Sequence, residues 1–271
     1  MQQSLHVPVN PVRFVTAASL FDGHDAAINI MRRLLQEQGV EVVHLGHDRS
    51  VSEVADAVVQ EDAAGVAVSS YQGGHLEYFT YLVEELRRRG AGEVRVYGGG
   101  GGVIVPTEIE ALAQLGVHIF SPSEGQRLGL PAMINILVAE CDVPLSPAPA
   151  DVDQIAAGST LALARSISLL QSGRGQALGA RIVASRASGG RRVPVLGITG
   201  TGGSGKSSLS DELISRLRRD SRDTVRIAVL AVDPTRRRSG GALLGDRIRM
   251  NSLDPGVTFF RSIAPRGSNQ S

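Results

Sequence analysis

The feature that most constrains the fold is a regular alternation of short β-rich runs and helix-patterned segments. Between the runs, apolar residues recur at helical spacing, and a fifth helix is predicted after Pro131. Five successive β-α units predict an α/β domain built on a flavodoxin-like, Rossmann-type doubly wound parallel sheet, covered on both faces. The predicted strands occupy residues 13–18, 41–45, 65–69, 93–97 and 117–120.

Ligands of such a sheet bind at the carboxyl ends of its strands, so the loops after the β-rich runs are the candidate sites. His24 follows the first run, where a neutral imidazole can bind a metal while Asp22 accepts its second ring N–H. The competing interpretation is that His24 caps a helix or faces solvent.

Two further loops are predicted at the same edge of the sheet. Ser69 and Ser70 follow the third run, and five consecutive glycines, residues 98–102, follow the fourth. A run of glycines lets a bulky flat ligand approach the backbone, although a flexible loop has the same composition. Together the loops predict a deep slot between strands.

The second half of the chain has a different organisation. Residues 142–150 are proline-rich and predict a stiff linker, and residues 151–188 have a helical pattern. A strand is predicted at residues 193–198, followed by a helix over 205–219 and strands at 226–232 and 257–260. We therefore expect three parts: a domain over 1–141, a helical linker over 142–192, and a partial P-loop NTPase α/β domain over 193–271.

The strongest motif is Gly200-Thr-Gly-Gly-Ser-Gly-Lys-Ser207, which matches G-x-x-x-x-G-K-[ST] between a predicted strand and a predicted helix. Backbone N–H groups of such a loop point at phosphate oxygens, and the helix N-terminus adds partial positive charge. Lys206, the only lysine in the chain, is the predicted catalytic residue and would reach the β- and γ-phosphates. The competing interpretation is a flexible glycine loop before an ordinary helix.

Magnesium at such a site needs oxygen ligands close to the phosphates. The hydroxyl of Ser207 is one candidate, Asp233 after the predicted strand is another, and Asp246 lies on a loop able to approach the γ-phosphate. A turn-forming Asp-Pro and a solvated loop acid are the competing interpretations of the two aspartates. Only 64 residues follow Ser207 and no N-K-x-D segment is present, so we expect a truncated NTPase whose base preference cannot be read.

Composition narrows the class of protein. Apolar residues make up 42% and charged residues 20%, which excludes a disordered tail or a membrane bundle, and the single cysteine, Cys141, excludes an internal disulfide. Residues 1–145 carry a net charge of −9 and residues 146–271 a net charge of +10, which favours two domains with different ligands. A cytoplasmic protein is expected, since no apolar run is long enough to span a bilayer.

The segment Asp22-Gly-His24, the Ser69-Ser70-Tyr71 segment and the glycine cluster resemble the cobalamin-binding domain of adenosylcobalamin-dependent acyl-CoA mutases. The phosphate loop and AVDPTRRRSGGALLGDRIRM resemble the G-protein chaperones of those enzymes. Both in one chain, in this order, resemble the N-terminal part of the fused isobutyryl-CoA mutase family. Ala27 departs from the usual glycine of that pattern, and Tyr71 from leucine.

The resemblance implies residue roles at both sites. His24 would be the lower axial ligand of cobalt with Asp22 as its partner, and the displaced cofactor tail would enter a slot lined by Ser69, Ser70, Gly98, Gly99 and Gly100. In the second half, the resemblance implies residues that would bind GTP and Mg²⁺. Phosphates would be held by Gly203, Ser204, Gly205, Lys206, Ser207 and Ser208, Mg²⁺ by Ser207, Asp233, Asp246 and the carbonyl of Val232, and nucleotide by Arg249.

The resemblance also implies an isomerase in the intact protein, converting isobutyryl-CoA to n-butyryl-CoA, with a GTPase that gates loading of adenosylcobalamin. Its partners would be the acyl-CoA substrate, GTP and GDP, an adenosyltransferase that delivers cofactor, and a second copy in a homodimer, with no nucleic acid or membrane. This segment would bind cofactor without mutase turnover and hydrolyse GTP feebly or not at all. The alternative is a receiver or flavodoxin-like regulatory domain fused to a P-loop ATPase.

Overall fold

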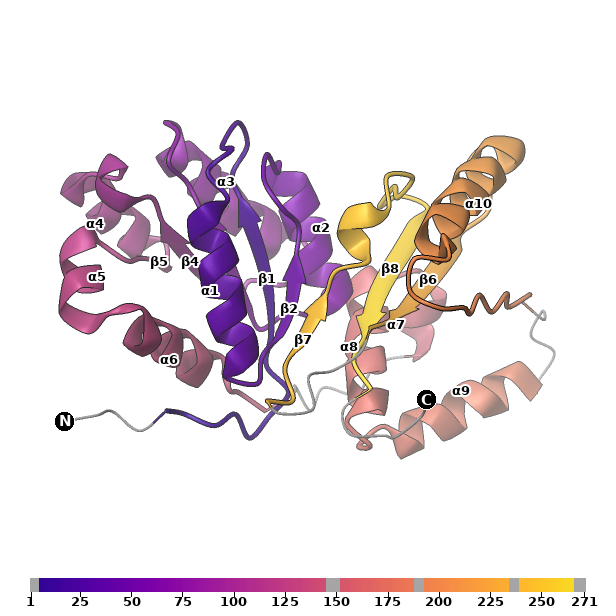
Figure 1. Cartoon of the computed structure of the whole chain (residues 1–271). Helices are drawn as coiled ribbons and strands as arrows, with labels where there is room; N and C mark the ends of the chain where they lie inside the picture. The colour runs from indigo at the N-terminus through magenta and orange to yellow at the C-terminus, as the bar shows by residue number, and fades with distance from the viewer. Residues whose placement is uncertain (1–4, 145–151, 188–192, 234–238, 266–271) are drawn as a thin grey trace.

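A computed structural model describes residues 5–144, 152–187, 193–233 and 239–265. Two parallel sheets stand side by side, with helices packed around both (Figure 1). The larger sheet has six strands in the order β5-β4-β3-β1-β2-β7, and the smaller has two, β6 and β8. None of the helices in the described part of the chain has the length and apolarity needed to cross a bilayer.

The first five strands confirm the predicted doubly wound parallel sheet. Each is parallel to its neighbours, and β1 lies between β2 and β3, so the chain reverses its direction of winding there. The strand bounds are β1 Arg13–Ala18, β2 Glu41–His44, β3 Gly65–Ser69, β4 Arg95–Gly99 and β5 Val117–Ile119.

Helices cover both faces of this sheet, as the alternation of patterns predicts. Successive residues of a strand face opposite sides, so Phe14 packs in the core under one set of helices and Val15 in the core under the other. One face carries α1 Ala26–Glu37 and α6 Leu130–Cys141, with α5 Pro122–Leu128 packed on α6. The other carries α2 Val51–Glu61, α3 His75–Arg88 and α4 Pro106–Gln114.

The second half begins with helices α7 Val152–Ala156, α8 Thr160–Gln171 and α9 Gln176–Ala187. Helix α10, Lys206–Ser221, follows the phosphate-loop motif, and β6 Ile227–Val232 pairs in parallel with β8 Thr258–Ile263. In Figure 1, α10 and this two-stranded sheet lie beside the larger sheet. The short 3₁₀ helices are η1 Gly101–Val103 and η2 Arg247–Arg249.

Three sequence predictions need correction. The predicted strand at residues 193–198 is wrong: this segment is exposed and belongs to no strand, because apolar content alone supplies no partner for backbone hydrogen bonds. The fourth strand lies two residues later than predicted, so Gly98 and Gly99 belong to β4 rather than to a loop. Strand β7, Ala242–Leu244, was not predicted, and it pairs with β2 as the sixth strand of the larger sheet.

Asp142 anchors the segment that precedes β1. Its carboxylate accepts hydrogen bonds from the backbone N–H groups of Val9 and Asn10, both at 2.8 Å, from the Asn10 side-chain amide at 2.9 Å, and from His6 Nε2 at 2.8 Å. Burial raises the pKa of Asp142, but these bonds outweigh burial and lower it to about 2.

We predict that this anchor makes stability depend on pH. Because the folded-state pKa lies below the ordinary value of 3.8, the contribution is complete above that value and is lost as pH falls toward 2. Urea unfolding should show that the stability difference between the parent chain and Asp142→Asn shrinks by about 2 kcal/mol from pH 5 to pH 2. A difference independent of pH would contradict this account.

Candidate functional site

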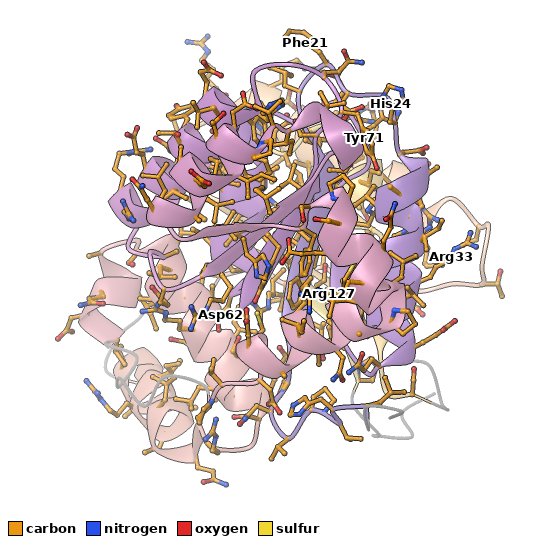
Figure 2. The ribbon with its side chains drawn as sticks, turned by 90° about the vertical axis from the view of Figure 1, so that its left-hand side faces the viewer. Phe21, His24, Arg33, Asp62, Tyr71 and Arg127 are labelled. Atoms are coloured by element: carbon orange, nitrogen blue, oxygen red, sulfur yellow. The ribbon has the colours of Figure 1, made fainter. Side chains whose placement is uncertain are left out.

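Asp22 and His24 form a hydrogen-bonded pair in the loop between β1 and α1. Asp22 Oδ1 accepts from the His24 backbone N–H and faces His24 Nδ1, both at 2.8 Å, while Oδ2 accepts from the Tyr71 backbone N–H at 2.6 Å. The Asp22 side chain is fully buried, whereas that of His24 is 64% exposed. Figure 2 shows Phe21, His24 and Tyr71 at one end of the molecule and Asp62 toward the other.

The hydrogen bonds of Asp22 determine its charge and the ring state of His24. Burial raises the pKa of Asp22, but the N–H groups of Tyr71 and His24, together with the His24 ring, outweigh burial and lower it below its ordinary value. The ionised carboxylate favours a proton on Nδ1, so in the neutral ring the lone pair is on Nε2. Through that nitrogen the exposed His24 side chain can ligate a metal.

A cavity of about 410 Å³ opens beside this loop, between the sheet and helix α1. Ser69 Oγ lines it and is buried without a hydrogen-bond partner among the described residues. A buried hydroxyl without a partner costs free energy, so the site fits a ligand that brings polar atoms to Ser69. Its apolar wall includes Phe120, Met133 and Leu137.

Glycines at the end of β4 bring two backbones into direct contact. A Cβ on Gly98 would lie 2.4 Å from Phe79 Cζ, and a Cβ on Gly100 would lie 1.9 Å from the Ser70 carbonyl oxygen. Gly99 has open space instead, and its carbonyl accepts from the Ser70 N–H at 2.8 Å. The structure thus brings together every residue predicted for the slot: Ser69, Ser70, Gly98, Gly99 and Gly100 line the cavity or contact its floor.

The two departures from the family pattern fit the loop. Ala27 lies in the first turn of α1 and is not among the residues with positive φ, so its Cβ is tolerated. The side chain of Tyr71 faces the His24 ring with centroids 5.6 Å apart. The hydrogen bond from the Tyr71 backbone to Asp22 has no signal in the sequence, because it joins loops 49 positions apart.

The phosphate-loop motif has the backbone geometry that its glycines allow. Gly203 and Gly205 have φ of 78° and 83°, in the left-handed region that favours glycine. Lys206 Nζ donates to the Thr201 carbonyl at 2.8 Å, a contact that sequence analysis missed. Ser204 and Gly205 are exposed, and Ser207 and Ser208 lie in the first turn of α10, after Lys206.

The structure brings Asp246 to the phosphate loop. Ser207 Oγ donates to Asp246 Oδ1 at 3.3 Å, and Arg249 lies 3.8 Å from the same oxygen. Asp233 directly follows Val232, the last residue of β6, and its Oδ2 is buried without a partner among the described residues. Burial, followed by repulsion from Asp246, raises the pKa of Asp233 to about 6. Two close carboxylates and a hydroxyl are the donor set that a hard cation such as Mg²⁺ takes.

Two family models match the chain. Residues 12–127 match the B12 binding domain, and residues 163–270 match the methylmalonyl Co-A mutase-associated GTPase MeaB. Neither match is to a receiver domain, so the alternative of a signalling protein is not supported.

The curated relatives agree with these matches. The chain is 65% identical over 269 residues to the fused isobutyryl-CoA mutase of Nocardia farcinica, covering 98% of this chain and 25% of that protein. It is 56% identical to the fused isobutyryl-CoA mutase of Cupriavidus metallidurans, over 96% of this chain and 24% of that protein. It is also 34% identical to the 2-hydroxyisobutanoyl-CoA mutase small subunit of Aquincola tertiaricarbonis, over 40% of this chain and 78% of that protein.

The sheet, the two sites and the matched families define a B12-binding domain joined to a MeaB-type GTPase region, which implies cobalamin and GTP as ligands. Over nearly its whole length the chain is homologous to the fused isobutyryl-CoA mutases, and it spans about a quarter of the length of these curated relatives.

We predict that Gly100→Ala destabilises the chain by about 2 kcal/mol, because its Cβ would overlap the Ser70 carbonyl oxygen and force the two strand ends apart. Gly102→Ala is the matched control, since a Cβ there meets nothing within 4 Å. Chemical unfolding of both variants checks this. Equal stability of the two would mean that the backbones are not in contact.

Proposed function

We propose that the chain is the cofactor-loading part of an adenosylcobalamin-dependent isobutyryl-CoA mutase. The observation that supports the cobalamin half is the buried Asp22 carboxylate, which faces Nδ1 of the exposed His24 ring on the loop beside the cavity that Ser69 lines. When bound, adenosylcobalamin supplies the radical chemistry of a carbon-skeleton rearrangement, isobutyryl-CoA to n-butyryl-CoA in the intact protein.

The residues of the chain hold and orient the cofactor. His24 would ligate cobalt through Nε2, and Asp22 would keep the proton on Nδ1 and increase the basicity of the ring. The cofactor tail would occupy the 410 Å³ cavity, where the Ser69 hydroxyl would gain a hydrogen-bond partner. Gly98, Gly99 and Gly100 would let its flat part lie against the backbone.

The second half would bind Mg²⁺ and GTP. The residues proposed for the phosphates are Gly203, Ser204, Gly205, Lys206, Ser207 and Ser208, and Arg249 would contact the nucleotide. Ser207, Asp233, Asp246 and the Val232 carbonyl would hold Mg²⁺, a role supported by the bond between Ser207 and Asp246 and by the unpartnered oxygen of Asp233. In the intact protein, GTP hydrolysis would gate cofactor loading, with an adenosyltransferase as donor and a homodimer as assembly.

We predict that His24→Ala abolishes the base-off, histidine-coordinated visible spectrum obtained when adenosylcobalamin is added to the purified chain, because no other ring nitrogen replaces Nε2. His47→Ala is the control, since His47 is an exposed histidine on the neighbouring loop after β2. An unchanged spectrum in His24→Ala would disprove the assignment of the ligand.

We predict that Lys206→Ala weakens binding of a non-hydrolysable Mg²⁺·GTP analogue by about a hundredfold, because a charge-assisted hydrogen bond to phosphate contributes about 3 kcal/mol. Arg219→Ala, near the far end of the same helix, is the control and should bind as the parent does. Calorimetric titration measures both. Retained affinity in Lys206→Ala would refute the phosphate role.

A further inference from the structure

A side chain of the B12-binding domain contacts the loop that carries the proposed magnesium ligand Asp246. Gln60, on α2, is 3% exposed, and its Oε1 accepts hydrogen bonds from Arg247 Nη2 at 3.0 Å and from the Phe260 backbone N–H at 3.2 Å. Its Nε2 donates to the Thr258 carbonyl at 3.3 Å. Gln60 therefore bonds both to β8 and to the residue that follows Asp246.

Arg247 is held from several sides. Its side chain is 8% exposed, its Nη1 donates to the Phe260 carbonyl at 3.3 Å, and its guanidinium lies 5.6 Å from the centroid of the Phe260 ring. A buried guanidinium that lost its acceptors would carry a large desolvation cost, so it stays where Gln60 and Phe260 hold it. This fixes the backbone at position 247 and, with it, the adjoining Asp246.

The same loop is attached to the larger sheet at its other end. Strand β7 pairs with β2, with Leu244 opposite Val43, and Asp246 follows two residues later. Beyond it, Ile248 packs on the turn after β2 so closely that a Cβ on Gly46 would lie 2.8 Å from Ile248 Cδ1. The B12-binding domain thus contacts the chain both before Asp246, through β7, and after it, through Ile248.

We propose that Gln60 is a positioning residue of the nucleotide site, which holds Asp246 in place for Mg²⁺ through Arg247. The proposal rests on the proposed nucleotide function of Ser207 and Asp246. It makes the magnesium site of the second half dependent on a helix of the first half. If contacts within the second half alone held the Asp246 loop, the hydrogen bond between Gln60 and Arg247 would not be needed to position it.

The hydrogen bond to Arg247 and the charged side chains around position 60 determine which substitutions of Gln60 keep its proposed positioning role. The charged groups around position 60 are the buried Arg13, Arg247, Arg261, Glu41 and Glu61. Asp56 also interacts electrostatically with Arg247, and Asp62 with Arg261. Gln60→Glu keeps an acceptor oxygen for Arg247, although it loses the Nε2 donor to the Thr258 carbonyl. Gln60→Met fills the same volume without any acceptor.

The test compares the affinity for a non-hydrolysable GTP analogue in Mg²⁺ with the affinity in EDTA. For Gln60→Met we expect the ratio of the two to fall about tenfold, the size seen when a residue behind a metal ligand is removed, with the EDTA affinity unchanged. Gln60→Glu should restore the parent ratio. Gln171→Ala, which removes an acceptor of Arg261 rather than of Arg247, is the matched control and should leave it unchanged.

The outcomes distinguish the positioning role of Gln60 from the proposed nucleotide function of the second half. A parent chain with Mg²⁺-dependent binding and an unchanged ratio in Gln60→Met would overturn the positioning role alone. A parent chain with no Mg²⁺-dependent binding would overturn the proposed nucleotide function and this inference with it. Should Gln60→Met not fold, Gln60→Asn shortens the arm by one methylene, and the same fall in the ratio is expected.

Discussion

The arrangement of the two sheets depends on one buried carboxylate. Glu61 is fully buried at the end of α2 and accepts hydrogen bonds from Arg13 of β1 at 3.1 Å and from the backbone N–H and hydroxyl of Ser262 of β8, both at 3.0 Å. An ionised carboxylate without such partners would cost several kcal/mol in the interior. Because its donors come from both sheets, β8 must lie against α2, and the loop of Asp246 then lies beside the turn after β2.

The Asp22 loop uses the same physical principle on a smaller scale. Its buried carboxylate is satisfied by N–H groups from its own loop and from the loop after β3, so the His24 ring is oriented by groups that solvent does not reach. The exposed ring also faces the side chain of Tyr71, with ring centroids 5.6 Å apart. A buried acid behind an exposed ring therefore determines which ring nitrogen faces the protein.

The first five strands of the larger sheet could be predicted from the sequence, because runs such as β1 and β3 are rich in apolar residues, and every residue in these two strands is buried. The same criterion failed at residues 193–198, where an apolar run exists without a strand partner. It also missed β7, because three residues, Ala242–Leu244, are too few to form a periodic pattern. Ser207 and Asp246, both predicted from the sequence, are hydrogen-bonded to each other. They could be identified because their residue types suit a magnesium site, and this criterion does not require knowing which strands pair.

The contacts between the halves could not be predicted in this way. Gln60 and Glu61 end an ordinary amphipathic helix, and the residues that cover them lie about 200 positions later. One signal was present in the opposite net charges of residues 1–145 and 146–271, which we interpreted as evidence for different ligands. Part of this charge difference instead serves contacts inside the protein. Arg247 and Arg261 of the basic half are buried against Glu61 and Gln60 of the acidic half. Arginines that attract an anionic ligand and arginines that join two domains contribute equally to the net charge of a sequence. The burial of each side chain in the structure distinguishes the two roles.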